Sequence, residues 1–124
     1  MTGEVLTFLG GDPARIALFE AMEAAVLACG ESTMAVSKSQ ISWGNPKKFA
    51  FFSFHHCPKG CAAATFGLGR RVDAPQIWQA VEPYPNRWTH HVLLAAPADV
   101  TPALGGWLKE AYTFAQAKGR RRGS

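Results

Sequence analysis

The sequence lacks any long apolar run and contains only three cysteines, and both features narrow the class of protein. A membrane-spanning helix needs ~20 consecutive apolar residues, and no stretch of the chain approaches that length. The opening residues MTGEVLTFLGGD have neither a basic start nor a long apolar run, so we expect no secretory signal. An odd cysteine count without such a signal predicts a cytoplasmic protein with reduced thiols and no membrane contact.

Sequence motifs of several common enzyme classes are also missing. The stretch TFGLGRR contains G-x-G, but it lacks the third glycine and the following helix of a dinucleotide-binding loop. There is no G-x-S-x-G, no H-E-x-x-H and no spaced pair of carboxylates in a plausible cleft. The sequence therefore favours a protein without enzymatic activity, while leaving an enzyme open as an alternative.

What the chain does contain is sufficient for one globular domain. Of its 124 residues, 48% are apolar and 18% charged, and eight phenylalanines and four tryptophans can fill a core. We expect a single domain over 1–124, with an ordered core at about 8–118 and a basic tail at 119–124. The net charge is +4, and the four cations between Lys118 and Arg122 equal that excess, so the body of the domain is expected to be neutral.

An amphipathic helix is predicted near the N-terminal end. Asp12 can accept a backbone N–H bond as the N-cap, and Pro13 suits the first helical position. Apolar residues then recur at helical spacing as far as Cys29, which is therefore expected in the core. Gly30 can end this helix in a left-handed conformation.

A second amphipathic helix is predicted at the C-terminal end. Thr101 and Pro102 repeat the cap and proline start, and an apolar stripe follows from Leu104 onward. Gly105 and Gly106 weaken a helix by up to ~1 kcal/mol each relative to alanine. A close packing contact would explain their presence.

The middle of the chain reads as extended segments separated by Gly/Pro turns. Between residues 70 and 86 the pattern is weaker, and we predict one helical turn at APQIWQAV and a loop at VEPYPNR. Because two amphipathic helices need a sheet face to bury against, the predicted fold class is α+β. It consists of a single antiparallel sheet of about five strands with the N-terminal and C-terminal helices packed on one face. The opposite face would be open, curved around a cleft, or covered by a partner. The predicted strands are about Met34–Ser37, Gln40–Trp43, Lys48–His56, a run ending near Leu68, and Arg87–Ala96.

The stretch HHCPKGC concentrates two histidines and two cysteines in seven residues. Because strand residues alternate between faces, His55 and Cys57 share one face, and Cys61 can meet them across the turn. His90 or His91 could supply a fourth ligand, which would complete a zinc site. The C-x3-C spacing is not that of the usual zinc motifs, and an ordinary hairpin end is the alternative.

A second interpretation of HHCPKGC is that it contains a reactive thiol. Cys57 has His56 and Lys59 close by in sequence, and a neighbouring base or cation is what activates a thiolate. Proximity within a turn arises easily, and no separate oxyanion-hole motif accompanies it.

Aromatic and basic residues are mixed through the central segments. An exposed sheet with aromatics and flanking cations can stack bases and hold phosphates. The alternative is that the aromatic side chains form the core and the cations surround it. The candidate residues for binding a nucleic acid or another ligand or partner are Lys38, Trp43, Arg70, Arg71, Trp88 and His91.

The stretches KSQISWGNPKKFAFF, RWTHHVLL and DVTPALGGWLKEAY resemble a family of small bacterial domains of unknown function, sometimes labelled predicted transport proteins. The resemblance covers about Phe8 to Ala115, and HHCPKGC departs from the family pattern. It implies an accessory or binding role and brings no established activity, substrate or catalytic residue. Its most specific pieces are Lys38 with Ile41, the Phe49–Ala50 pair, His91, and Trp107 with Ala111 and Tyr112.

The leading hypothesis is therefore a non-enzymatic binding module with no cofactor, whose partner is a small molecule, a nucleic acid or a protein. A small-molecule version predicts a concave apolar pocket between the sheet and the helices. One alternative is a metal- or thiol-dependent enzyme at the 55–61 hairpin, with zinc as its metal. Another is a homodimer that hides an apolar strand face.

Overall fold

A computed structural model describes the backbone of residues 2–55 and 57–123, and their side chains apart from residue 84 and residues 118–123. The side chains of the predicted basic tail thus lie outside the described residues, as does His56. No helix in the described part of the chain is both long enough and apolar enough to cross a membrane.

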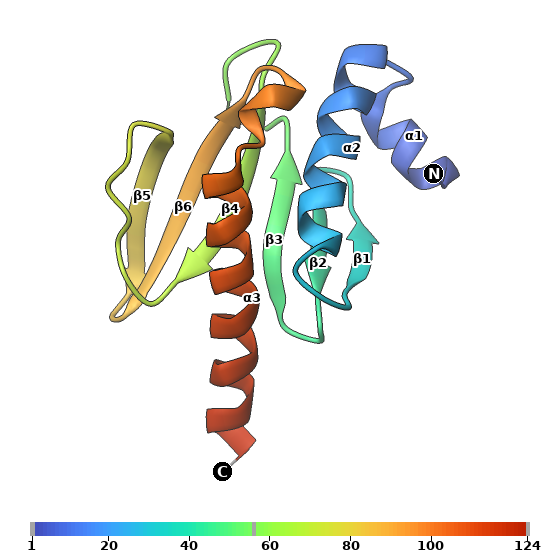
Figure 1. The fold of residues 1–124 in the computed structure, drawn as a ribbon. Helices are drawn as coiled ribbons and strands as arrows, with labels where there is room; N and C mark the ends of the chain where they lie inside the picture. Colours follow the sequence, from blue (N-terminus) through green and yellow to red (C-terminus); the bar gives the residue numbers. More distant parts are fainter. Residues whose placement is uncertain (1, 56, 124) are drawn as a thin grey trace.

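The described chain forms an α+β fold in which helices precede and follow one antiparallel sheet (Figure 1). The sheet order is β1-β2-β3-β4-β6-β5, and every neighbouring pair is antiparallel. This confirms the predicted fold class, with six strands where about five were expected. The elements are α1 (Gly3–Leu9), α2 (Pro13–Leu27), β1 (Thr33–Val36), β2 (Ile41–Gly44), β3 (Lys48–Ser53), β4 (Ala62–Leu68), β5 (Ile77–Tyr84), β6 (Arg87–Leu94), the 3-10 helix η1 (Pro97–Asp99) and α3 (Pro102–Gly123).

The additional strand is β5, and it corrects the prediction of a helical turn and loop between 70 and 86. Ile77 pairs with Val92 of β6, so the segment is extended along a neighbouring strand. β-Branched and aromatic residues suit that position, and Pro83 is tolerated because an edge strand leaves one side without a ladder partner. The chain then reverses through Asn86, whose φ of 65° is left-handed.

Both long helices lie on one face of the sheet, with α3 in front of β3 and β4 and α2 beside it (Figure 1). The Phe19 ring of α2 stacks on Trp43 of β2 at a centroid distance of 6.1 Å and meets Phe52 of β3 edge-on at 5.9 Å. Phe52 and Leu108 of α3 are fully buried in the same core. Side chains thus fill the space where a pocket between sheet and helices was expected.

The start and packing of the two long helices agree with the sequence. Asp12 accepts a bond from the backbone N–H of Ala14 at 2.9 Å, and Thr101 accepts one from Leu104 at 3.2 Å. Cys29 is 3% exposed, which confirms it as a core cysteine.

The structure corrects the expected packing of Gly105 and Gly106. A Cβ built on either glycine meets nothing within 4 Å, so no close packing contact explains them. Strict alternation along β3 would also place Phe49 on the face of Phe51. A register shift between Trp43 and Gly44 instead turns Phe49 toward the helices, where its ring centroid lies 5.0 Å from that of Tyr112. The short helix α1 was not predicted, because its seven residues contain only one i, i+4 pair of buried residues, Val5 and Leu9.

Candidate functional site: a hollow on the open face of the sheet

The two long helices lie on one face of the sheet (Figure 1). The other face carries a hollow of about 540 Å³, which we call the open-face hollow. Its lining combines hydroxyl, amide and imidazole groups with a few aromatic and small apolar side chains. The lining residues are Ser39, Gln40, Phe51, Ser53, His55, Ala63, Thr65, Trp78, Gln79, Arg87, Thr89 and His91.

Strand alternation explains which residues reach the open-face hollow. On β6, Arg87, Thr89 and His91 line it, whereas His90 and Val92 between and beyond them are buried on the helix side. On β4, Thr65 pairs with His91 in the register and points the same way. Most of the lining therefore comes from strands β3, β4, β5 and β6, which hold side chains more rigidly than loops do.

Thr65 and His91 form the polar pair of the open-face hollow. The Thr65 hydroxyl oxygen lies 2.8 Å from Nδ1 of His91, within hydrogen-bonding distance. Burial lowers the pKa of His91 below its ordinary value, so the ring is neutral at pH 7 and either donates to or accepts from the hydroxyl.

Arg87 is held in an unusual way. A Cβ built on Gly67 of β4 would lie 2.6 Å from Nη2 and 2.7 Å from Cζ of Arg87. The guanidinium therefore lies directly across the glycine backbone, in space that any other residue would fill. No aspartate or glutamate lines the open-face hollow among the residues that the structure describes.

Aromatic surface completes the open-face hollow. Phe51 of β3 is half-buried, and Trp78 of β5 remains 39% exposed, which is unusual for so large an apolar side chain. Such surface can bury the flat apolar part of a ligand.

Of the six candidate ligand-binding residues from the sequence, the structure places only His91 in the open-face hollow. Lys38 is exposed in the turn between β1 and β2, next to the hollow-lining Ser39. Trp43 is 1% exposed in the core, so it offers no contact surface. Trp88 pairs with Leu68 on the helix side of the sheet, away from the hollow.

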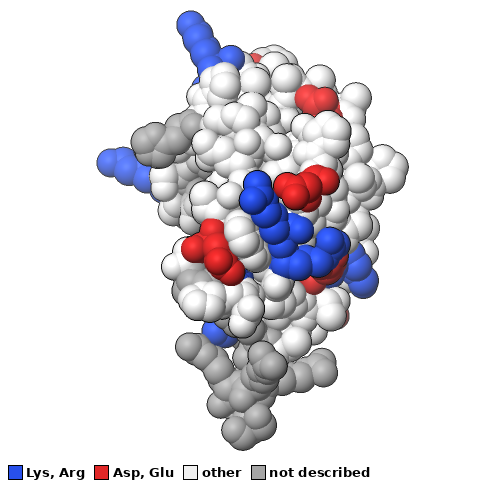
Figure 2. All heavy atoms as spheres, turned by 90° about the vertical axis from the view of Figure 1, so that its left-hand side faces the viewer, with Lys and Arg blue, Asp and Glu red and all other residues white. Residues whose placement is uncertain are grey.

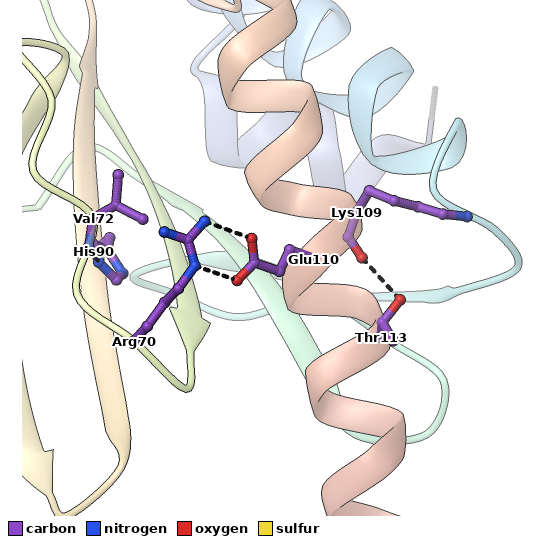
Figure 3. A network of polar contacts seen from close by, with 6 residues as sticks. All are labelled: Arg70, Val72, His90, Lys109, Glu110 and Thr113. Carbon is purple, nitrogen blue, oxygen red and sulfur yellow. Dashed lines mark hydrogen bonds and ion pairs between the residues drawn. The ribbon is translucent and has the colours of Figure 1, made fainter.

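The two remaining arginines have partners of their own. Arg70 makes two bonds to the Glu110 carboxylate, of 2.9 and 2.8 Å, which link the end of β4 to α3 (Figure 3). Arg71 Nε lies 3.3 Å from Asp73 Oδ1, and Arg71 Cζ lies 5.6 Å from the centroid of the Trp88 ring.

On the side of the molecule that carries β5, basic and acidic side chains lie next to one another and most of the surface is uncharged (Figure 2).

The histidines and cysteines considered for zinc do not come together. His90 is fully buried on the helix side, stacked on Phe66 at 5.2 Å, and its Nε2 accepts a bond from the backbone N–H of Val72 at 2.9 Å. Cys61 adjoins the Ala62–Leu94 pair, so His90 lies roughly 13 Å further along the strand at about 3.3 Å per residue. Nowhere in 2–55 or 57–123 do three His, Cys, Asp or Glu side chains converge as metal ligands would.

The cysteines at the 55–61 hairpin are thiols with little sign of activation. Cys57 Sγ donates to the Cys61 carbonyl oxygen at 3.3 Å. Burial raises the pKa of Cys57, the neighbouring Cys61 raises it further, and Arg15 only partly opposes them. A thiol with a raised pKa is largely protonated at neutral pH and is a weak nucleophile.

Two other hollows offer less to a ligand than the open-face hollow. One, of about 470 Å³, lies between the end of α2 and β1 and is lined by Glu31, Ser32 and Asn45 among others. The second, of about 370 Å³, lies beside the Arg70–Glu110 pair, whose charges already satisfy each other.

Sequence reasoning missed most of the hollow residues, although one signal was available. His91 was selected because it lies in the stretch RWTHHVLL. Strand alternation along that stretch puts Thr89 and Arg87 on the same face as His91, which is the signal that could have found them. Thr65 and Gly67 could not be found in this way, because their place opposite β6 depends on the register between strands that are distant in sequence.

Comparison with protein families matches residues 6–115 to a family described as "Domain of unknown function (DUF5655)". The match runs from within α1 to within α3 and includes all six strands. Comparisons with curated proteins and with solved structures give no match. Because the match spans most of the chain and nearly the range expected from the resemblance in the sequence, this chain belongs to the DUF5655 family of domains of unknown function.

Proposed function

We propose that the protein is a non-enzymatic binding module that holds a small molecule in the open-face hollow. The observation that carries this proposal is the hollow itself, about 540 Å³ in volume and lined by aromatic, hydroxyl and imidazole groups. Ligand sites commonly measure ≈ 300–1,000 Å³ and combine apolar surface with a few oriented polar groups. The volume corresponds to a small ligand, and rigid strands supply its walls.

A nucleic-acid ligand is less well supported than a small molecule. Binding to phosphates needs several unpaired cations along one surface. Of the three cations that the sequence suggested for this role, Arg70 is engaged by Glu110 and Arg71 by Asp73. Both arginines are therefore already paired with carboxylates of the domain itself.

The enzyme alternative has still less support. His55, Cys57 and Cys61 lie at the hairpin without His90, and Cys57 has a raised thiol pKa. We also propose a cytoplasmic location for the protein. The three cysteines of the chain are free thiols, as is usual in that compartment. A bacterial source and a transport-related role, both implied by the resemblance in the sequence, are compatible with a module that binds a small molecule.

The proposal is tested by titrating ¹⁵N-labelled protein with a library of small organic fragments and following the backbone amide signals. We expect shifts to concentrate at hollow residues such as Phe51, Thr65, Gln79 and His91. Thr89→Trp should fill the open-face hollow and abolish these shifts. Ala117→Trp, which places the same bulk on an exposed position of α3, should leave them unchanged.

Three outcomes would contradict the proposal. One is that the fragments bind elsewhere, or that Thr89→Trp does not affect them. Another is tight oligonucleotide binding that weakens steeply with added salt, which would favour the nucleic-acid version. The third is a dimer by light scattering whose interface covers the hollow, which would favour a homodimer.

A further inference from the structure

We infer that the ligand of the open-face hollow carries an oxyanion, a carboxylate or a phosphate group, and that Arg87 binds it. This inference rests on the proposed function and specifies the chemical class of ligand.

The charge of the open-face hollow is uncompensated. Arg87 lines it, and the described lining contains no aspartate or glutamate. The two other arginines near the sheet differ, since Arg70 is paired with Glu110 and Arg71 with Asp73. The guanidinium of Arg87 is half-buried, and no carboxylate lines the described hollow beside it. A ligand anion can therefore supply charge-assisted hydrogen bonds that replace the hydration that this charge has lost.

The geometry of Arg87 also suits an oxyanion. Its guanidinium lies across Gly67, within 2.6–2.7 Å of where a Cβ would stand, so the glycine makes room for the planar group. A planar guanidinium presents two parallel N–H donors that match the two oxygens of a carboxylate or phosphate. Gly67 therefore acts as a positioning residue for Arg87.

Further donors lie along the same strands. Thr89 follows Arg87 by two residues on the same face of β6, and it pairs with Gly67 in the register. The Thr65–His91 pair comes next along β4 and β6. A ligand anion held by Arg87 thus lies beside hydroxyl groups, while Phe51 and Trp78 offer surface for an aromatic or apolar remainder.

The test compares four probes of similar shape and different charge: benzoate, phenyl phosphate, neutral benzamide and cationic benzylamine. Binding is followed by amide shifts of the hollow residues at up to about 10 mM probe, enough to detect a Kd of about 1 mM. We expect benzoate or phenyl phosphate to bind about tenfold more tightly than benzamide, as a charge-assisted pair implies. Benzylamine should not bind. The stronger of the two anions identifies the oxyanion.

Two variants separate the role of Arg87 from loss of the fold. Arg87→Gln should remove the preference for the anions while leaving weak benzamide binding. Gly67→Ala keeps the charge but displaces the guanidinium, whose flexible end can move at little cost, so it should weaken anion binding severalfold and leave benzamide unchanged. Gly106→Ala, where a Cβ meets nothing within 4 Å, is the matched control and should change neither.

The possible failures point to different conclusions. Benzamide binding as tightly as benzoate, or benzoate binding unaffected by Arg87→Gln, overturns the oxyanion inference and leaves the proposed function standing. If neither these probes nor the fragment library shifts the hollow amides, both proposals fail together. Equal losses in Gly67→Ala and Gly106→Ala would refute the positioning role of Gly67.

Discussion

Thr65 and His91 face each other across β4 and β6, with 2.8 Å between the Thr65 hydroxyl oxygen and Nδ1 of His91. They are 26 residues apart in sequence, so only strand pairing brings them together. The contact gives a half-buried imidazole a hydrogen-bonding partner on the open face and orients its ring. Since strand register fixes both residues, the contact reports on the geometry of the open-face hollow without any ligand.

Thr65→Val removes this hydroxyl with little change in side-chain volume. We expect a loss of about 0.5–1.5 kcal/mol in the free energy of unfolding, the usual net value of one such hydrogen bond. We also expect a change in the ¹⁵N shifts of the His91 ring, measured by NMR. Thr113→Val is the control, because Thr113 is exposed and its hydroxyl donates to the Lys109 carbonyl one turn earlier in α3. If the His91 ring signals match those of the wild type, the contact does not orient the ring.

Buried neutral His90 makes the stability of the fold sensitive to acid. Burial is the main cause that lowers the pKa of His90, with smaller opposing effects from the Trp88 carbonyl and Glu110. In the unfolded chain His90 takes up a proton near pH 6.5, whereas in the folded chain it stays neutral to a lower pH. The free energy of unfolding therefore falls as the pH drops below 6.5. Burial lowers the pKa of His91 too, which adds to the same trend.

His90→Leu should flatten this pH dependence while destabilising the fold at pH 8. The substitution leaves the buried N–H of Val72 without its acceptor, which costs about 1–3 kcal/mol. Urea unfolding at several pH values between 8 and 5 measures both effects. Leu94→Ala, another buried position on β6, should destabilise by about 2–5 kcal/mol and keep the wild-type pH slope. An unchanged slope in His90→Leu would show that His90 is not the titrating group.

The fold was predictable to the extent that it depends on local pattern. Asp12 and Thr101 cap the long helices as expected, because capping involves only neighbouring residues. β5 was missed because β6 stabilises Ile77–Tyr84 through pairing, which overrides a weak local pattern. The bulge that turns Phe49 toward α3 shifts the alternation by one residue. Gly44 marks the place, because a Cβ there would lie 2.8 Å from the backbone of Lys47 and Lys48, but a glycine beside a turn does not by itself specify a bulge.

The candidate site was less predictable than the fold. Trp43 looked available for stacking, yet Phe19 of α2 covers it in the core. Arg70 looked like part of a basic surface, but a glutamate 40 residues away neutralises it. Such partners come from distant elements, so their effect on a residue follows from the tertiary arrangement rather than from neighbouring sequence.

The Arg70–Glu110 pair should support the fold at neutral pH and less so in acid (Figure 3). The hydrogen bonds from Arg70 are the main cause that lowers the pKa of Glu110, and burial opposes them. Stabilisation from a carboxylate with a lowered pKa is present above its ordinary value of 4.5 and disappears as the pH falls through its folded pKa. Glu110→Gln should therefore reduce stability at pH 7 and make the decline below pH 4.5 shallower, as followed by urea unfolding. The effect should be small and diminish in high salt, because the side chains of Arg70 and Glu110 are 58% and 40% exposed. A difference between the two proteins that grows on acidification would contradict this account.

Tyr112 of α3 packs against Gly30, which lies in the segment that leads from α2 to β1. A Cβ built on Gly30 would lie 2.8 Å from Cζ and Oη of Tyr112, and its φ of +146° suits glycine. Tyr112 is also fixed by its other partners, since its hydroxyl donates to the Glu31 carbonyl at 3.0 Å and accepts from Asn45 at 3.1 Å. An alanine at position 30 must therefore strain the backbone and displace the ring.

Gly30→Ala should lower the free energy of unfolding by more than the ~1–3 kcal/mol that backbone strain alone costs. Gly60→Ala isolates the strain, because Gly60 has a φ of +87° and open space around its Cβ position. The steric part is measured by adding Tyr112→Ala to each glycine variant in urea unfolding. Removal of the ring should offset part of the loss in Gly30→Ala, giving a coupling energy, whereas Gly60→Ala and Tyr112→Ala should be additive. Additivity in both pairs would mean that Tyr112 does not press against Gly30.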